Sequence, residues 1–195
     1  MKILIVLGHP DPNSFNHAIA AGVHAALMHD GHDVILRDLA AEGFDPRLSV
    51  AELDGKGAMP EDIRPYCEEL RTAEGIVIVH PNWWGQPPAI LKGWIDRVLR
   101  AGVAYRFQEG DGGEGVPIGL LKAGAAVVLN TSNTPEEREH KAFGDPLDTL
   151  WRRCIFDLCG VGTFHRRMFG VIVTSTLEQR RAWIEEAQNL SRDIF

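Results

Sequence analysis

The segment from His9 to Asn16, His-Pro-Asp-Pro-Asn-Ser-Phe-Asn, joins turn-forming residues to the start of a helical pattern. Ser14 or Asn13 is placed to cap that helix, which leaves the first backbone N–H groups and the positive end of the dipole facing outward. Such an end binds phosphate. The segment holds no Lys or Arg, and Asp11 adds negative charge, so amides, the Ser14 hydroxyl and asparagine side chains must hold the anion. Such a site suits the terminal phosphate or the pyrophosphate of a cofactor. The alternative interpretation is an ordinary turn between a strand and a helix.

A second polar turn, from His80 to Pro88, reads His-Pro-Asn-Trp-Trp-Gly-Gln-Pro-Pro. Two adjacent tryptophans in a loop bounded by prolines are unusual, because large aromatic side chains are normally buried. We interpret Trp83 and Trp84 as a wall for a flat aromatic ligand. The alternative is that one indole fills the core and the other caps the sheet. A third polar turn, Asn-Thr-Ser-Asn-Thr, occupies residues 130–134.

Continuous apolar runs precede all three turns, which is the pattern of strands buried on both faces of a parallel sheet. Segments with helical spacing alternate with these runs. The alternation predicts an α/β fold, a doubly wound five-stranded parallel sheet with strand order 2-1-3-4-5, in a single domain over residues 1–195. We expect strands at 3–7, 33–39, 75–80, 125–129 and within 166–173, and helices from residue 15 and at 61–73, 89–100, 146–158 and 177–192.

Two segments lack both patterns, and we expect residues 40–60 and 101–122 to be irregular. The second of them contains residues 110–115, which match GxGxxG literally. No strand precedes this motif and no helix follows it, so we interpret it as a surface loop and not as a dinucleotide site.

In a doubly wound sheet, ligands bind outside the carboxyl ends of the strands, where the strand order reverses. The three polar turns follow such ends, so we expect them to be neighbours in space. Together they predict a crevice with an anion cradle at one end and aromatic, amide-rich walls at the other. A flavin suits this crevice, with its phosphate at residues 9–16 and its isoalloxazine ring between 81–86 and 130–134.

The composition excludes other classes of protein. A formal net charge of −7 argues against a nucleic-acid partner, which needs a basic face. The three cysteines, Cys67, Cys154 and Cys159, show no CxxC spacing and predict neither a metal site nor a disulfide framework. We expect a reducing, cytoplasmic setting. No stretch approaches the ~20 apolar residues of a membrane span, and the apolar run at the N-terminus is too short for a signal peptide.

Residues 81–98, Pro-Asn-Trp-Trp-Gly-Gln-Pro-Pro-Ala-Ile-Leu-Lys-Gly-Trp-Ile-Asp-Arg-Val, and the turn at 9–16 resemble the NAD(P)H:quinone reductase family of the DT-diaphorase type. Residues 158–160 and 178–180 resemble it as well. Its relatives include modulator-of-drug-activity proteins and ancillary proteins of potassium efflux systems. The resemblance implies a flavodoxin-like fold, a homodimer, and two-electron reduction of quinones by NAD(P)H.

The resemblance also implies roles for particular residues. Tyr105 and Phe107 match aromatic residues that cover the substrate pocket from the second subunit, and His140 lies near a histidine that assists hydride transfer. Arg180 matches an arginine near the adenine half of FAD, which favours FAD. The 40–60 segment is shorter than in the family, which keeps FMN as the alternative. The implied cofactor residues are His9, Ser14, Phe15, Asn16, Pro81, Asn82, Trp83, Trp84, Gly85, Thr131, Ser132, Asn133 and Arg180.

The sequence therefore predicts a flavin-dependent NAD(P)H oxidoreductase that passes hydride by a ping-pong mechanism to quinones or similar flat acceptors. Two alternatives stay open. One is a flavin-binding regulatory subunit of a potassium efflux system, and the other is an electron carrier of the flavodoxin type. The choice between NADH and NADPH and the identity of the acceptor are also open.

Overall fold

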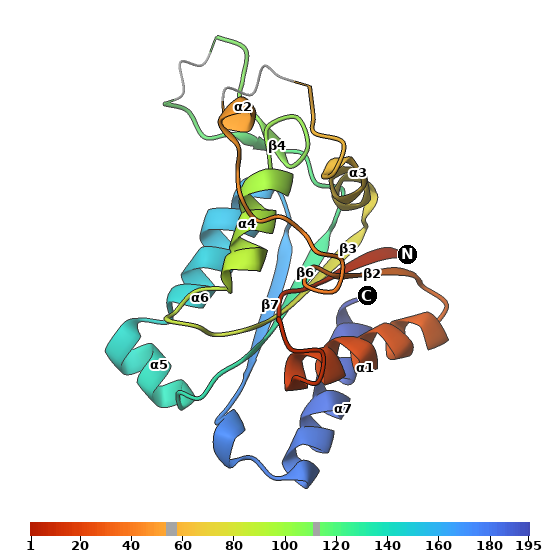
Figure 1. Ribbon diagram of the computed structural model, residues 1–195, viewed down its shortest axis with the longest axis vertical. Helices are drawn as coiled ribbons and strands as arrows, with labels where there is room; N and C mark the ends of the chain where they lie inside the picture. The colour runs from red at the N-terminus through yellow and green to blue at the C-terminus, as the bar shows by residue number, and fades with distance from the viewer. Residues whose placement is uncertain (54–57, 111–113) are drawn as a thin grey trace.

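The computed structural model describes residues 1–53, 58–110 and 114–195 (Figure 1). Its centre is a five-stranded sheet with strand order β2-β1-β3-β6-β7. Every neighbouring pair in this sheet runs parallel. This is the flavodoxin-like, doubly wound arrangement, and it confirms the predicted fold class and strand order. The strands are β1 (Lys2–Leu7), β2 (Asp33–Asp38), β3 (Gly75–Pro81), β6 (Ala125–Thr131) and β7 (Thr163–Phe169).

Helices cover both faces of the sheet (Figure 1). Helices α1 (Phe15–His29) and α7 (Leu177–Ile194) pack against one face. Helices α3 (Arg64–Thr72) and α4 (Ala89–Val98) pack against the other face, together with the π-helix η1 (Thr149–Asp157). Because both faces are covered, β3 and β6 are buried at every position, which explains the apolar runs at 75–79 and 125–129.

Shorter elements join these layers. They are α2 (Val50–Leu53), α5 (Glu136–Phe143), α6 (Pro146–Asp148), the 3-10 helix η2 (Ile172–Thr174), and a two-stranded antiparallel ribbon of β4 (Tyr105–Arg106) and β5 (Ile118–Gly119). The predicted helix at 146–158 is therefore present as α6 continued by η1. Among the described residues, no helix has the length and apolarity needed to cross a bilayer.

Three expectations needed correction. The last strand of the sheet covers Thr163–Phe169 and so begins before the predicted 166–173 segment, because this edge strand carries polar side chains that hide its start. The segments expected to be irregular contain α2 and the β4–β5 ribbon. Helix α5 was not expected, because its sequence is almost entirely polar. Residues 54–57 and 111–113, and with them the middle of the GxGxxG match, lie outside the described residues.

Candidate functional site

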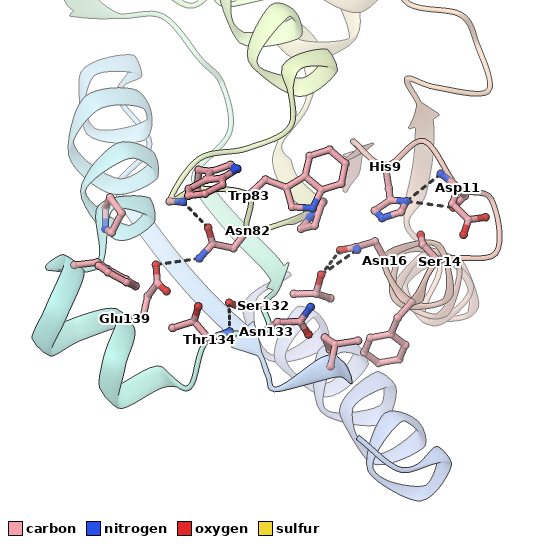
Figure 2. Close-up of a pocket in the computed structure, with 18 residues that line it drawn as sticks. His9, Asp11, Ser14, Asn16, Asn82, Trp83, Ser132, Asn133, Thr134 and Glu139 are labelled. Carbon is pink, nitrogen blue, oxygen red and sulfur yellow. Dashed lines mark hydrogen bonds between the residues drawn. The ribbon is translucent and has the colours of Figure 1, made fainter. Parts of the chain in front are cut away.

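A cavity of about 730 Å³ opens where β1, β3 and β6 end (Figure 2). The three predicted polar turns surround it, because parallel strands bring their carboxyl ends to one edge of the sheet. All of the predicted cofactor residues except Arg180 line this cavity. We call the part lined by residues 9–16, together with the adjoining His17, the α1 end, and the part lined by residues 81–85 and 131–134 the tryptophan end.

At the α1 end, the turn before the helix is held by its own polar groups (Figure 2). The Asp11 backbone N–H donates to His9 Nδ1 at 3.0 Å, and the Asn13 N–H donates to Asp11 Oδ1 at 2.9 Å. Ser14 has extended backbone angles and caps α1, since its Oγ accepts from the His17 N–H at 3.3 Å. Phe15 and Asn16, the first two residues of the helix, line the cavity, so the end of the helix that suits an anion borders it.

The side chains of Ser14, His17 and Asp38 form a row of hydrogen bonds that starts at the helix cap. Ser14 Oγ lies 2.8 Å from His17 Nδ1, and His17 Nε2 lies 2.8 Å from Asp38 Oδ2 at the end of β2. Asp38 is itself fixed, because its other oxygen accepts the N–H groups of Ala40 and Ala41 at 3.2 and 3.1 Å. The His17 side chain is only 17% exposed, so its ring is largely enclosed by these contacts.

The second imidazole at this end is His9, whose ring lies edge-on to that of His17 with centroids 6.2 Å apart. Burial lowers the pKa of His9 below its ordinary value, and the nearby His17 lowers it further, against the backbone hydrogen bond with Asp11. His9 is therefore held in its neutral form near neutral pH, with Nδ1 as acceptor.

At the tryptophan end, Asn82 organises the loop (Figure 2). Its Oδ1 accepts the Gly85 N–H at 2.9 Å, and its Nδ2 donates to Glu139 Oε1 at 2.9 Å. Trp84 and Gly85 have φ angles of 59° and 72°, in the left-handed region. A side chain at Gly85 would also meet Pro146 at 2.7 Å, so only glycine suits this tight approach.

The two indoles of this loop are exposed. Trp83 keeps 45% of its surface accessible and Trp84 all of it. The alternative that one of them fills the core is therefore wrong, and the fully buried indoles are those of Trp94 and Trp151. The Trp83 ring packs against the His9 ring, with centroids 5.9 Å apart, and so connects the two ends of the cavity. Two flat, solvent-facing rings can stack on a planar ligand.

A buried pair of polar side chains joins the two ends beneath the cavity. Asn16 Nδ2 donates to Thr131 Oγ1 at 3.0 Å, which connects α1 to the end of β6. The loop beyond Thr131 is fixed in turn, because the Ser132 N–H donates to the Phe169 carbonyl at 2.9 Å and Ser132 Oγ accepts the Thr134 N–H at 3.0 Å. These contacts hold both walls at a defined separation.

His80 supports the tryptophan end from inside the protein. Its ring is fully buried, and its Nε2 accepts the indole N–H of Trp151 at 3.0 Å. An indole nitrogen is a donor only, so Nδ1 carries the ring proton and donates to the Pro81 carbonyl at 2.8 Å. Burial, aided by the Arg166 charge, lowers the pKa of His80 to about 4. This neutral histidine fixes the first residue of the loop.

Four predicted residues do not line the cavity of their own chain. Arg180 lies beside it, with its guanidinium 5.8 Å from the Phe15 ring and hydrogen-bonded to the Ile172 carbonyl at 3.0 Å. His140 is half exposed and faces Asp145, with 3.3 Å between Nε2 and Oδ2. Nothing described places its ring against the cavity, and its catalytic role stays a prediction. Tyr105 and Phe107 pack edge to face in and beside the ribbon, at 5.8 Å.

Several lining residues were missed because helix α5 was missed. Glu139 and Phe143 come from α5, and Pro146 follows it. Glu139 is almost fully buried, yet it borders the cavity through its contact with Asn82. The sequence does carry start and stop signals for this helix, a proline with two glutamates after it and Gly144 at its end. Asp11, Thr134 and Ile172 complete the lining.

The residues present suit a flavin. The cavity volume lies within the range of roughly 300–1,000 Å³ that is usual for small-molecule sites. One end offers free helix N–H groups and a hydroxyl to a phosphate, and the other offers exposed indoles and neutral polar side chains to a ring. Among the described residues, no cluster of three or more His, Cys, Asp or Glu could hold a metal ion.

Comparisons with known proteins agree with this geometry. A model of the flavodoxin-like fold family matches residues 1–190. The chain is 34% identical over 194 residues to an uncharacterized NAD(P)H oxidoreductase of Haemophilus influenzae, covering 96% of this chain and 92% of the relative. It is 33% identical over 125 residues to NAD(P)H dehydrogenase (quinone) 1 of Rattus norvegicus, covering 54% and 46% of the two chains. The solved NAD(P)H:quinone oxidoreductase of Methanothermobacter marburgensis superposes with a TM-score of 0.86 at 25% identity, covering 99% and 96%.

Proposed function

The chain belongs to the flavodoxin-like fold family, and we propose that it is a flavin-dependent NAD(P)H oxidoreductase that reduces quinones or similar flat acceptors. The observation that carries this proposal is the shape of the cavity at the carboxyl ends of β1, β3 and β6. A helix N-terminus at one end suits a phosphate, and exposed indoles at the other end suit a planar ring. The names of the relatives from Haemophilus influenzae and Rattus norvegicus support the same activity.

A bound flavin would supply the hydride transfer chemistry between NAD(P)H and the acceptor. The protein's own residues bind and position it. Ser14 and the first N–H groups of α1 would hold its phosphate. Asn82, through Gly85 and Glu139, keeps the 81–85 loop in one conformation.

We propose a ping-pong order of substrates. The isoalloxazine ring would lie between the 81–85 loop and the 131–134 loop, so one of its faces is covered by protein. NAD(P)H and the acceptor would then need the same open face beside the exposed indoles, and each must leave before the other enters. The tight fixing of both loops by Asn82 and Ser132 supports this, because neither loop has to move to admit a ligand.

We propose FAD as the cofactor, with FMN as the alternative. Arg180 lies beside the cavity next to Phe15 and Ile172, which line it. Its charge would favour the pyrophosphate or adenine part of a dinucleotide that extends past α1. FMN would end at Ser14 and leave Arg180 without a role in binding.

We also propose that a second copy of the chain completes the substrate pocket. Tyr105 and Phe107 do not line the cavity of their own chain, and Phe107 is half exposed. In a homodimer, these two rings would cover the open face of the neighbouring subunit's ring site. The acceptor would then lie between indoles of one subunit and these aromatic residues of the other.

The test starts with the purified protein and its colour. We expect it to show the absorption bands of flavin, or to acquire them on incubation with FAD or FMN, and to oxidise NAD(P)H only when a simple quinone is present. Heat release followed by mass measurement identifies the flavin. A colourless protein that reconstitutes with neither FAD nor FMN would contradict the proposal.

A further inference from the structure

We propose that His17 takes up a proton when the phosphate of a flavin binds at the α1 end, and so becomes the cation that balances the phosphate charge. This inference rests on the proposed flavin site and adds a residue whose ionisation controls it. The Ser14–His17–Asp38 chain carries the argument, together with the charges of the residues that line the cavity.

The proton positions in this chain follow from its geometry. Asp38 can only accept, so His17 Nε2 carries a proton and donates it across 2.8 Å. His17 Nδ1 lies 2.8 Å from Ser14 Oγ, and that contact has two possible forms. In the neutral form, the Ser14 hydroxyl donates to Nδ1. In the cationic form, Nδ1–H donates to Ser14 Oγ, and the hydroxyl proton is free to point elsewhere.

A phosphate selects between these two forms. Phosphate oxygens are acceptors, so a phosphate beside Ser14 needs the hydroxyl to donate to it. The hydroxyl cannot donate to His17 at the same time, because it has a single proton. Nδ1 would then face an oxygen without a proton between them. Uptake of one proton from water at Nδ1 restores this contact, and the hydroxyl turns toward the phosphate oxygen. No covalent bond to a heavy atom changes.

The charge of the cavity favours the same outcome. None of the eighteen described residues that line it is Lys or Arg, whereas Asp11 and Glu139 are acidic. The phosphate would meet no fixed cation among these lining residues, because Arg180 lies beside the cavity and is not one of them. The His17 ring has about a sixth of its side chain exposed, which limits screening by water. A charge on His17 would be separated from the phosphate by one hydroxyl group.

The other charged and titratable groups around His17 leave it as the proton acceptor. Asp38 faces it from the end of β2, and His9 faces it from the turn after β1. The Asp38 carboxylate attracts a positive charge. His9 is held neutral because burial, and after it the nearby His17, lower its pKa, as described above. Two imidazoles whose centroids are 6.2 Å apart disfavour a double charge, so one proton and not two is expected.

Calorimetry measures this proton directly. The flavin-free protein is titrated with FMN and, separately, with riboflavin, in buffers that differ in ionisation enthalpy. The pH is about 8, well above the second pKa of a phosphate ester, which is about 6. We expect proton uptake with FMN and none with riboflavin, which lacks the phosphate. Linkage then requires the FMN dissociation constant to rise with pH over the range in which the proton is taken up.

Two variants assign the proton to His17. His17→Asn keeps a side-chain N–H that can donate to Ser14 but cannot titrate, and we expect it to bind FMN without proton uptake. Asp38→Asn removes the charge that holds the ring and is expected to reduce the uptake. His24→Asn, on the same helix, is the matched control and should behave as the unmodified protein.

Each outcome bears on the inference. Uptake with FMN that disappears in His17→Asn supports it. Uptake that persists in His17→Asn, or a ³¹P shift showing that the phosphate itself is protonated, overturns it. Binding of FMN without proton uptake overturns it and leaves the proposed function standing. Binding of neither FMN nor FAD contradicts the proposed function and this inference together.

Discussion

Histidine serves opposite purposes at the two ends of the cavity. Beneath the tryptophan end, His80 is fully buried, with the Pro81 carbonyl and the Trp151 indole N–H as partners. Those partners permit only the neutral ring. At the α1 end, His17 lies between a hydroxyl and a carboxylate, and these partners accommodate either a neutral or a charged ring. His80 therefore fixes the conformation of the tryptophan end, whereas the partners of His17 allow its ring to be neutral or charged.

The same contrast extends to the rest of each end. Asn82, Trp83 and the 131–134 loop offer neutral groups and flat surfaces. The α1 end offers N–H groups, a hydroxyl and two imidazoles. If the ends have the roles we propose, substitutions at the α1 end weaken FMN but spare riboflavin, whereas substitutions at the tryptophan end weaken both equally. The four predictions below use this comparison.

The largest effect is expected on the free energy of unfolding, from protonation of His80 at low pH. Its pKa of about 4 in the folded protein lies below the ordinary 6.5, so the unfolded chain binds the proton more readily. Stability is therefore complete above pH 6.5 and falls as the pH drops toward 4, by about 3 kcal/mol for this group. Urea unfolding at a series of pH values measures the loss. In His80→Gln this contribution should disappear from the pH profile, and an unchanged profile would contradict the assignment.

The second-largest effect is expected on FMN affinity, from removal of the Ser14 hydroxyl at the α1 end. Ser14→Ala loses a hydrogen bond to a charged group, which contributes about 2 kcal/mol, so FMN affinity should fall about 10- to 100-fold. Riboflavin affinity should change by less than about twofold, because its ring does not contact this end. Fluorescence titration with both ligands measures the two effects. Ser14→Thr, which keeps the hydroxyl, is the control. Equal losses of FMN and riboflavin affinity would contradict the assignment of the α1 end to the phosphate.

A smaller effect is expected from Asn82→Ala. The variant loses the hydrogen bonds to Gly85 and Glu139 that shape the loop. Because these bonds shape the loop and are not made to the ligand, we expect only part of their free energy, about 1 kcal/mol, to be lost from binding, so FMN and riboflavin should weaken alike, by about five- to tenfold. The ratio of the two dissociation constants should therefore stay constant. A loss confined to FMN would mean that this loop serves the phosphate.

The smallest effect on folding is expected from Trp84→Ala. The indole is fully exposed, so the free energy of unfolding should change by no more than about 0.5 kcal/mol. Lost stacking should weaken FMN and riboflavin equally, by about threefold to tenfold. Thermal unfolding and ligand titration on the same sample separate the two quantities. A large loss of stability with no change in binding would show that the ring serves the fold and not the ligand.

The sequence predicted the sheet because buried parallel strands have a local signature. The runs at β1, β3 and β6 are apolar at almost every position, and the turns after them carry the polar residues that line the cavity. The edge strand β7 and the polar helix α5 lack such a signature. Their positions depend on contacts with the rest of the fold, so the start of β7 was misplaced and α5 was missed.

The supporting contacts of the site could not be predicted, because their partners are distant in the sequence. His17 meets Asp38 across 21 positions, Asn82 meets Glu139 across 57, and His80 meets Trp151 across 71. Spacing along the chain predicts neighbours on one helix or strand. It does not predict which side chains meet when separate elements pack.

A crystal structure of the protein with FMN would test the central claim most directly. We expect the phosphate within hydrogen-bonding distance of Ser14 Oγ and the first N–H groups of α1, with the ring between residues 81–85 and 131–134. A phosphate bound elsewhere, or a ring lying outside those two loops, would contradict the account.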